Sequence, residues 1–262
     1  RAFVNAVVNQ QVPFTAIKDI RLCRSNIKDA GAAALASLLS ATATKKSIDT
    51  PSDPSAPQLL DWKLEYLELL GNDIGSEGAR SLGRSLCVGM NRTLTTLILD
   101  FNPLGSDGVA ALCKGLSTNS TLQRLSLKHC NIDEVGGRPI GEMLSFKKSQ
   151  LVSLDLTSNM IGGSGLIAFC DGLGANASLK TLRLGDNSIS CARALSSFAG
   201  VLVKHPTLIA IDLLHNKIGT NGGKLLIPAV RDNKQITEFK VDAKMDDEVF
   251  KLLFRVSTYS KK

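Results

Sequence analysis

The chain has 262 residues and a formal net charge of +7, with an apolar fraction of 44% and only 5% aromatic residues. This length suffices for one large domain or two small ones. No segment holds the roughly 18–20 consecutive apolar residues that a membrane-spanning helix needs, so we expect no membrane insertion. The positive charge is mild for the length and would have to cluster to indicate nucleic-acid binding. Because aromatics are scarce, the core must consist mostly of Leu, Ile, Val and Ala.

Two segments near the N-terminus differ from the rest of the chain. Residues 1–16 predict either a short capping helix or the remnant of a preceding repeat, and they have no basic leader followed by the apolar run of a secretory signal peptide. Residues 41–62 are polar and contain Pro51, Pro54 and Pro57, which predicts an inserted surface loop. This loop is either a tolerated insertion or a lid that binds a partner.

Residues 17–244 are organised by an internal repeat. The stretch LEYLELLGNDIGSEG begins at Leu64 and is matched by LTTLILDFNPLGSDG from Leu94, and further copies begin at positions 122, 151, 179 and 208. Successive copies start 28 to 30 residues apart and fit the pattern L-x-x-L-x-L-x-x-N/C-x-L if Ile stands for Leu. A degenerate copy starts at Ile17, and a last one begins at Ile236. This period and pattern indicate leucine-rich repeats, in a domain of about seven to eight turns.

Each repeat begins with the alternating pattern of a short strand and continues with helical apolar spacing, as in Leu82 and Leu86. A strand and a helix in every turn predict one parallel sheet with the helices on its other side. Because strands pack about 4.8 Å apart and helices about 10 Å apart, the stack must curve. The expected fold class is α/β: a leucine-rich repeat solenoid, a curved horseshoe with the strands on its concave face and the helices on its convex face.

One position of each repeat places an amide among apolar residues. The chain bends sharply after the strand, and the bend leaves backbone groups in a dry interior where they need partners. An Asn amide supplies both donors and an acceptor. We therefore expect a structural ladder made by Asn72, Asn102, Cys130, Asn159, Asn187 and Asn216, with Cys130 in the Asn position of one repeat.

The last segment, 245–262, predicts a C-terminal capping helix and tail. Its sequence MDDEVFKLLFRV places Asp246 and Asp247 where a helix begins, and acidic side chains are favourable at that end. A cap of this kind protects the final turn of a solenoid from solvent. The side chains expected to pack onto the last repeat are Val249, Leu252, Leu253 and Val256.

This long strand–helix repeat resembles the ribonuclease-inhibitor-like leucine-rich repeats. Repeats of that kind also occur in NOD-like receptors, in Ran GTPase-activating protein and in ciliary dynein-regulatory-complex subunits. The resemblance covers about residues 17–245 and rests on the pattern of leucines and asparagines. It implies the horseshoe fold and says little about function, because one fold hosts many functions.

The side chains between the inward leucines point away from the core into the arc. Their charges alternate in sign and no aromatic series accompanies them, so we expect no nucleic-acid partner. Four of them predict an exposed apolar patch typical of binding hot spots, unless the 41–62 loop covers it: Tyr66, Leu70, Ile98 and Phe101. The predicted partner-binding residues are Tyr66, Glu68, Leu70, Ile98, Asp100, Phe101, Lys128, His129, Asp155, Arg183, Asp212 and His215.

The other reactive side chains predict no catalytic residue, no metal site and no cofactor. The six cysteines fall mostly at repeat positions, which indicates free thiols in a reducing compartment. His129 and His215 stand three turns apart, about 14 Å at the sheet spacing, too far to share a metal. The stretch GTNGGK at 219–224 lacks the spacing and the Ser/Thr of a phosphate loop. Three Asn-x-Ser/Thr triplets share one pre-strand turn and are expected to stay unglycosylated: those at Asn91, Asn119 and Asn176.

Three functions remain open at this point. The first is a non-enzymatic protein–protein interaction module that binds a partner protein through its concave face. The second, implied by the resemblance alone, is a structural subunit of a large assembly such as a ciliary or axonemal complex. The third is a regulator of a GTPase, which the basic charge disfavours because the Ran-activating relatives are markedly acidic. We expect an intracellular, cytoplasmic location, with a cytoskeletal or ciliary site as an alternative.

Overall fold

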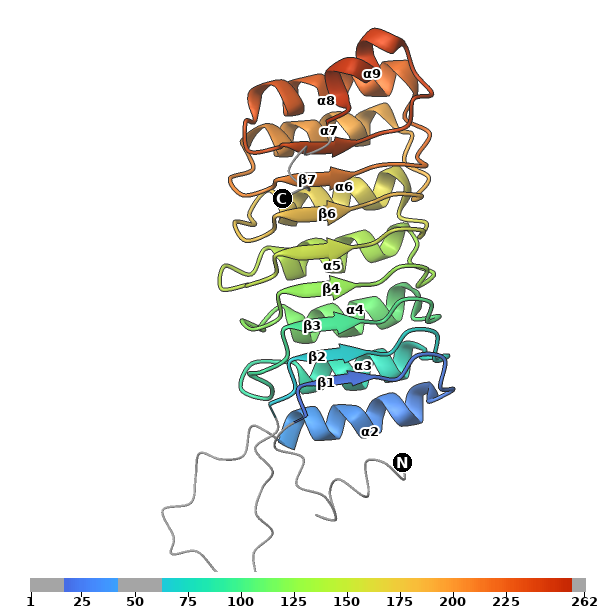
Figure 1. Cartoon of the computed structure of the whole chain (residues 1–262), viewed down its shortest axis with the longest axis vertical. Coiled ribbons are helices and arrows are strands. Elements are labelled where there is room, and N and C mark those ends of the chain that lie inside the picture. The colour runs from blue at the N-terminus through green and yellow to red at the C-terminus, as the bar shows by residue number, and fades with distance from the viewer. Residues whose placement is uncertain (1–16, 42–62, 256–262) are drawn as a thin grey trace, which may run out of the picture.

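The computed structural model describes residues 17–41 and 63–255 (Figure 1). The expected cap at 1–16, the loop from 42 to 62 and the tail after 255 lie outside the described residues. The described strands are β1 (Asp19–Arg21), β2 (Tyr66–Glu68), β3 (Thr96–Ile98), β4 (Arg124–Ser126), β5 (Ser153–Asp155), β6 (Thr181–Arg183), β7 (Ala210–Asp212) and β8 (Glu238–Lys240). The helices are α2 (Lys28–Ala41), α3 (Ser76–Ser85), α4 (Gly105–Leu116), the short 3-10 helix η2 (Glu134–Gly136), α5 (Gly137–Leu144), α6 (Gly162–Leu173), α7 (Ala192–Lys204), α8 (Gly219–Asp232) and α9 (Asp247–Leu253).

The strands form one parallel sheet in chain order, which confirms the predicted solenoid. Every strand pairs with the next through the equivalent residue of its repeat, so Leu67 faces Leu97 and Leu97 faces Leu125. This register follows from the period-two pattern, because a slip by one residue would turn every inward leucine to solvent. The arrowheads of all strands point to the same side of the stack (Figure 1).

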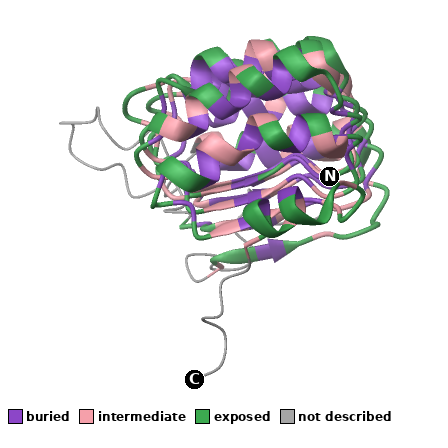
Figure 2. Cartoon of the chain, turned by 90° about the horizontal axis from the view of Figure 1, so that it is seen from above, coloured by how far each residue is buried: buried purple, intermediate pink, exposed green. Residues whose placement is uncertain are grey.

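The apolar core lies between the sheet and the layer of helices. Seen along the stack, buried residues fill the space between the two layers, and exposed residues cover the outer side of the helices (Figure 2). The inward strand positions and the helix residues facing them, such as Leu67, Leu82 and Leu86, are fully buried. Each repeat therefore contributes one strand and one helix face to a core that is continuous along the solenoid.

Asn102 shows how the amide position holds the bends together. Its Nδ2 donates to the carbonyl oxygens of Leu69 and Leu99, at 2.8 and 2.9 Å, and its Oδ1 accepts from the backbone N–H groups of Asn72 and Ile74 at 2.9 and 3.1 Å. Asn72, Asn159, Asn187 and Asn216 bridge neighbouring turns in the same manner. At Cys130, the thiol faces the carbonyl oxygen of Leu99 at 3.2 Å.

The third residue after the strand adopts a left-handed backbone conformation in repeat after repeat. Phe101, His129 and His215 have φ values of 58°, 50° and 62°. This conformation is uncommon outside glycine and needs support from the surrounding structure. Each of these residues directly precedes a member of the amide ladder, whose hydrogen bonds hold the bend. As a result, these three side chains are presented at the exit of the sheet in a defined orientation.

A second row of amides lies where the helices return to the strands. Sequence reasoning considered three of its four members, and only as glycosylation triplets. The Nδ2 atoms of Asn91, Asn119, Asn176 and Asn233 donate to carbonyl oxygens of Leu39, Leu86, Leu144 and Leu202, and all four residues are buried. Their Oδ1 atoms accept backbone N–H groups two residues ahead in the chain. Because each of these amide nitrogens is buried and bonded, the folded protein does not offer them to a glycan.

His205 occupies the same position in its own repeat. Its Nδ1 accepts from the N–H groups of Thr207 and Leu208 at 3.4 and 3.2 Å, while its buried Nε2 has no hydrogen-bond partner. Burial lowers the pKa of His205 from 6.5 to about 4. Between these two values the unfolded chain binds more protons than the folded one, so stability is complete above 6.5 and falls as the pH falls toward 4.

We expect replacement of His205 by Asn to remove this pH dependence. The wild-type free energy of unfolding should fall by about 2 kcal/mol more than that of His205→Asn between pH 7.5 and pH 5. At neutral pH the variant should be more stable by about 1 kcal/mol, because it removes an unpaired buried donor. Urea unfolding of both proteins at the two pH values measures the difference. Equal losses on acidification would contradict this role for His205.

The C-terminal helix is shorter than expected, and it presents a different set of side chains to the last repeat. Asp246 caps α9 by accepting from the N–H groups of Glu248 and Val249. Val249 and Leu253 are buried, but Leu252 is exposed, so the prediction that Leu252 packs inward was wrong. Beyond the helix, Arg255 forms an antiparallel bridge with Phe239, which pairs part of the outer edge of β8. Paired edges cannot recruit further strands.

Candidate functional site

The candidate site is the concave face, formed by the outward side chains of β1 to β8 and by the residues that follow each strand. Its most prominent residue is Phe101, which is 52% exposed. The Phe101 ring stacks on the ring of His129 from the next repeat, with 4.4 Å between centroids and 19° between planes. Stacked aromatic pairs of this kind contribute about 0.5–1.5 kcal/mol beyond their buried area. The pair is therefore a rigid apolar projection on the face.

The other members of the expected apolar patch are less accessible. Tyr66, Leu70 and Ile98 are only partly exposed, in contrast to Phe101. The Tyr66 hydroxyl donates to Glu68 Oε2 at 3.0 Å, and the Arg21 guanidinium lies 4.8 Å from the centre of the Tyr66 ring. Burial raises the pKa of Tyr66, and the hydrogen bond to Glu68 adds to that shift. The patch is thus narrower than the sequence suggested, with Phe101 as its exposed centre.

A row of charged side chains crosses four adjacent strands next to Phe101. Lys128 Nζ lies 3.9 Å from Asp100 Oδ2 and 3.5 Å from Asp155 Oδ2, and Arg183 Nη1 lies 3.6 Å from the same Asp155 oxygen. The two acidic side chains are only 8% exposed, whereas those of Lys128 and Arg183 are 40% and 46% exposed. A partner would therefore meet the cations.

The expectation that Asp100 and Asp155 contact a partner directly does not match this geometry. Asp100 Oδ1 accepts the backbone N–H of Lys128 at 3.0 Å, and Asp155 Oδ1 accepts the N–H and hydroxyl of Thr157 at 3.1 and 2.6 Å. Asp100 folds against the segment that follows the next strand, and Asp155 against the segment that follows its own strand, because backbone donors there need acceptors. Their role is to position the loops and the two cations.

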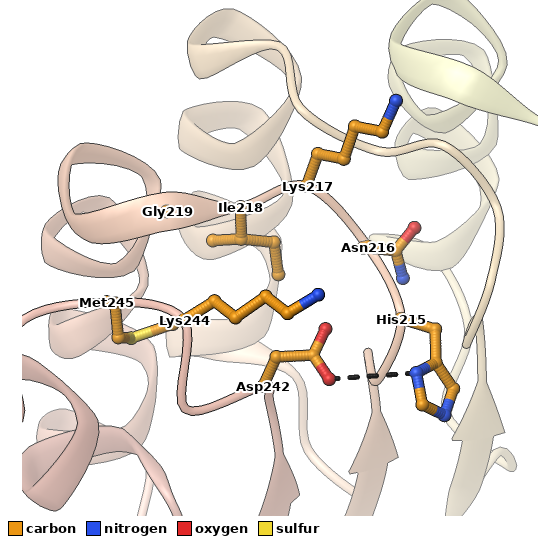
Figure 3. A pocket seen from close by; sticks show the side chains of 8 residues that line it. All are labelled: His215, Asn216, Lys217, Ile218, Gly219, Asp242, Lys244 and Met245. Atoms are coloured by element: carbon orange, nitrogen blue, oxygen red, sulfur yellow. Dashed lines mark ion pairs between the residues drawn. The ribbon is translucent and has the colours of Figure 1, made fainter.

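The last two repeats form a shallow depression at the strand-exit side of the face. Its volume is about 430 Å³, and it is lined by residues of the segments that follow β7 and β8. His215 and Asp242 face each other across it, with Nδ1 3.8 Å from Oδ1 (Figure 3). Asp212 is partly buried and accepts the N–H of Leu214 at 3.0 Å. Asp212 and His215 are thus far along the stack from Phe101, at the other end of the predicted site.

The described residues contain no group of three or more His, Cys, Asp or Glu side chains that is arranged to hold a metal ion. Burial raises the pKa of the Cys113, Cys130 and Cys170 thiols to about 12, which keeps them protonated and poorly nucleophilic. All six cysteines are free. Among the described helices, none is long and apolar enough to cross a bilayer.

Comparison with known proteins identifies the class. A family model described as Leucine Rich repeat matches residues 63–83, 91–113, 118–141, 148–170 and 204–226. The chain belongs to the leucine-rich repeat proteins, and its repeats are of the ribonuclease-inhibitor-like type.

Two relatives show the extent of the likeness. NACHT, LRR and PYD domains-containing protein 12 of Mus musculus is 33% identical over 185 residues, which cover 70% of this chain and 17% of the relative. Ribonuclease inhibitor of Sus scrofa is 33% identical over 162 residues, 61% of this chain and 35% of the inhibitor. The chain therefore spans about a third of the inhibitor and less of the NACHT, LRR and PYD domains-containing protein.

Among solved structures, the tropomodulin C-terminal domain of Caenorhabditis elegans matches 60% of this chain and 92% of its own, with a TM-score of 0.48 and 12% identity. An actin-binding site of leiomodin-1 matches with a TM-score of 0.46 and 18% identity. A likeness at this level says nothing about what the present chain binds.

Proposed function

We propose that the chain is a non-enzymatic interaction module that binds another protein through its concave face. The observation that carries the proposal is Phe101: a large apolar side chain, 52% exposed, fixed by a left-handed backbone and by stacking on His129. Anchors held in place before binding lose little conformational freedom when the partner arrives. Exposed aromatics with a charged surround are the residues that dominate binding energy at protein interfaces.

The surroundings of Phe101 indicate the chemistry of the partner. Lys128 and Arg183 present their charges to solvent, while Asp100 and Asp155 are nearly buried beneath them. The complementary surface is an apolar side chain that packs on Phe101, next to carboxylates that pair with the two cations. Such a partner would contact the central repeats, those that contain β3 to β6.

The state of the cysteines supports an intracellular location for this module. All six thiols are free, and two of them, Cys23 and Cys191, are exposed. Exposed free thiols persist in reducing compartments and are readily oxidised elsewhere. We therefore expect the partner to be an intracellular protein as well.

The test is a comparative affinity capture from lysate of the source cell. Phe101→Asp puts a charge where the proposal needs an apolar contact and should weaken capture of the partner by about 30-fold or more, equivalent to about 2 kcal/mol. Val135→Asp serves as the matched control, because Val135 is an apolar residue of η2 that is at least as exposed as Phe101 and lies away from the sheet. Identical protein sets for wild type and both variants would rule out a role for Phe101.

A further inference from the structure

The two long edges of the solenoid differ in charge. One of them, here called the helix-to-strand edge, consists of the turns at 86–95, 117–123, 145–152, 174–180, 205–209 and 233–237 (Figure 1). These turns contain no Asp or Glu and carry five cations: Arg92, Lys147, Lys148, Lys180 and Lys234. The turns on the opposite edge, where strands lead into helices, carry both signs of charge, with aspartates in excess. Their charged residues are Asp73, Asp100, Asp133, Asp186, Asp242 and Asp246, and the cations Arg24, Lys128, Lys217 and Lys244.

Helix electrostatics account for only part of this separation. Cations are favourable in the last turn of a helix, and Arg84, Lys114 and Lys204 lie there. The effect falls off beyond that turn, yet Arg92 and Lys180 each lie seven residues past the end of the preceding helix. The excess charge on the helix-to-strand edge is therefore not required by the helices.

The edge cations are also free to bind. Arg92, Lys147, Lys148 and Lys180 are exposed, and among the described residues none of them forms an ion pair. By contrast, Lys128 and Arg183 on the concave face are each paired with an aspartate. Unpaired like charges at neighbouring positions repel one another, and an anionic partner would relieve that repulsion.

A hollow of about 610 Å³ opens on this edge, between the turns that lead into β5 and β6. Its walls are mixed: Phe146, Val152 and two alanines are apolar, five further residues are uncharged and polar, and Lys147 and Lys180 are also among the lining residues. Phe146 is the one Phe, Tyr or Trp in the six turns, and it is partly buried. The edge thus has no row of exposed rings on which bases stack, as single-stranded nucleic acids require. A hollow with apolar and uncharged polar walls, flanked by cations, fits a polypeptide better than a phosphate backbone.

We propose that the helix-to-strand edge binds an acidic segment of a partner protein, with one apolar side chain of that segment in the hollow beside Lys147 and Lys180. The two lysines pair with carboxylates on either side of the anchored residue. Arg92, Lys148 and Lys234 extend the attraction along the edge and speed association. This surface is separate from the concave face, so the solenoid contacts partners on two sides.

Fluorescence anisotropy with a labelled peptide of alternating Glu and Asp and one central Leu tests this assignment on the full chain. At low salt, the Leu peptide should bind more tightly than the same peptide with Ser, by about tenfold for one buried apolar side chain. Lys147→Glu combined with Lys180→Glu should weaken binding by about tenfold or more. Lys224→Glu combined with Lys251→Glu makes the same charge change on α8 and α9 and should leave binding unchanged. Thermal unfolding of both variants verifies that they are folded.

Several results would overturn the proposal. These are a failure of the Leu peptide to bind, equal binding of the Leu and Ser peptides, equal weakening by the two double variants, or tighter binding of a single-stranded oligonucleotide or of phosphatidylserine vesicles. Phe101→Asp should retain the peptide, because Phe101 lies on the other surface. The assay therefore distinguishes failure of this proposal from failure of the concave-face function.

Discussion

Replacement of Asn102 by alanine is expected to lower the free energy of unfolding by about 4 kcal/mol. The side chain is fully buried, and its amide bonds five backbone groups from two adjacent turns. Alanine leaves those donors and acceptors in a dry interior, where each unpaired group costs about 1–3 kcal/mol before relaxation. The predicted loss is less than the simple sum, because the bend can shift and water can enter.

Urea unfolding of Asn102→Ala beside Asn221→Ala measures this effect. Asn221 is exposed in the first turns of α8, and its replacement should change stability by less than about 0.5 kcal/mol. Similar losses in the two variants would mean that the amide does not hold the turns together. A loss confined to Asn102→Ala would support the role that the sequence pattern assigns to all six ladder positions.

Replacement of Gly172 by alanine is expected to destabilise the protein by about 3 kcal/mol or more. A Cβ on Gly172 would lie 1.7 Å from the carbonyl oxygen of Gly141 and 2.6 Å from its Cα. The backbones of α5 and α6 therefore touch at this point, and Gly115 meets Gly83 in the same way between α3 and α4. Because the obstacle is backbone, the helices must separate to admit a methyl group.

Gly200→Ala is the control for this effect. Gly200 lies in α7, and a Cβ there meets no atom within 4 Å. Alanine should stabilise that helix by about 0.5–1 kcal/mol through its higher helix propensity. Thermal unfolding of the two variants should shift the midpoints in opposite directions. A rise in both midpoints would show that α5 and α6 can accommodate a methyl group at Gly172.

The fold could be predicted from the sequence because a single repeated pattern specifies both the strand pairing and the core. The leucine positions determine which face of each strand is buried, and parallel pairing of equivalent positions follows. Three of the four amides in the second row were visible as Asn-x-Ser/Thr triplets, but their role depends on carbonyl groups about 32 residues away in sequence. His205 conceals that row further, because its Nδ1 accepts the backbone N–H groups as the amides do, whereas its Nε2 makes no bond to the preceding turn.

The candidate site was predicted less well than the fold. Alternation along a strand identifies residues that leave the core, and it does not show whether a neighbour then covers them. Asp100 points away from the core but accepts a backbone N–H of the next turn, and Asp155 accepts the backbone N–H two residues ahead in its own turn. Phe101 remains exposed because the left-handed bend turns it away from the sheet. The prediction for Leu252 was wrong because α9 packs onto the last repeat through Val249 and Leu253, which leaves Leu252 exposed.

The most direct test of concave-face binding is site-specific photo-crosslinking in the source cell. Benzoylphenylalanine is placed at position 101 in one variant and at position 135 in another, where Val135 is exposed on η2 away from the sheet. The account predicts that position 101 yields a defined crosslinked protein, absent from position 135, and that Lys128→Glu combined with Arg183→Glu reduces its yield. A crosslinked species at position 135 with none at position 101 would contradict the account.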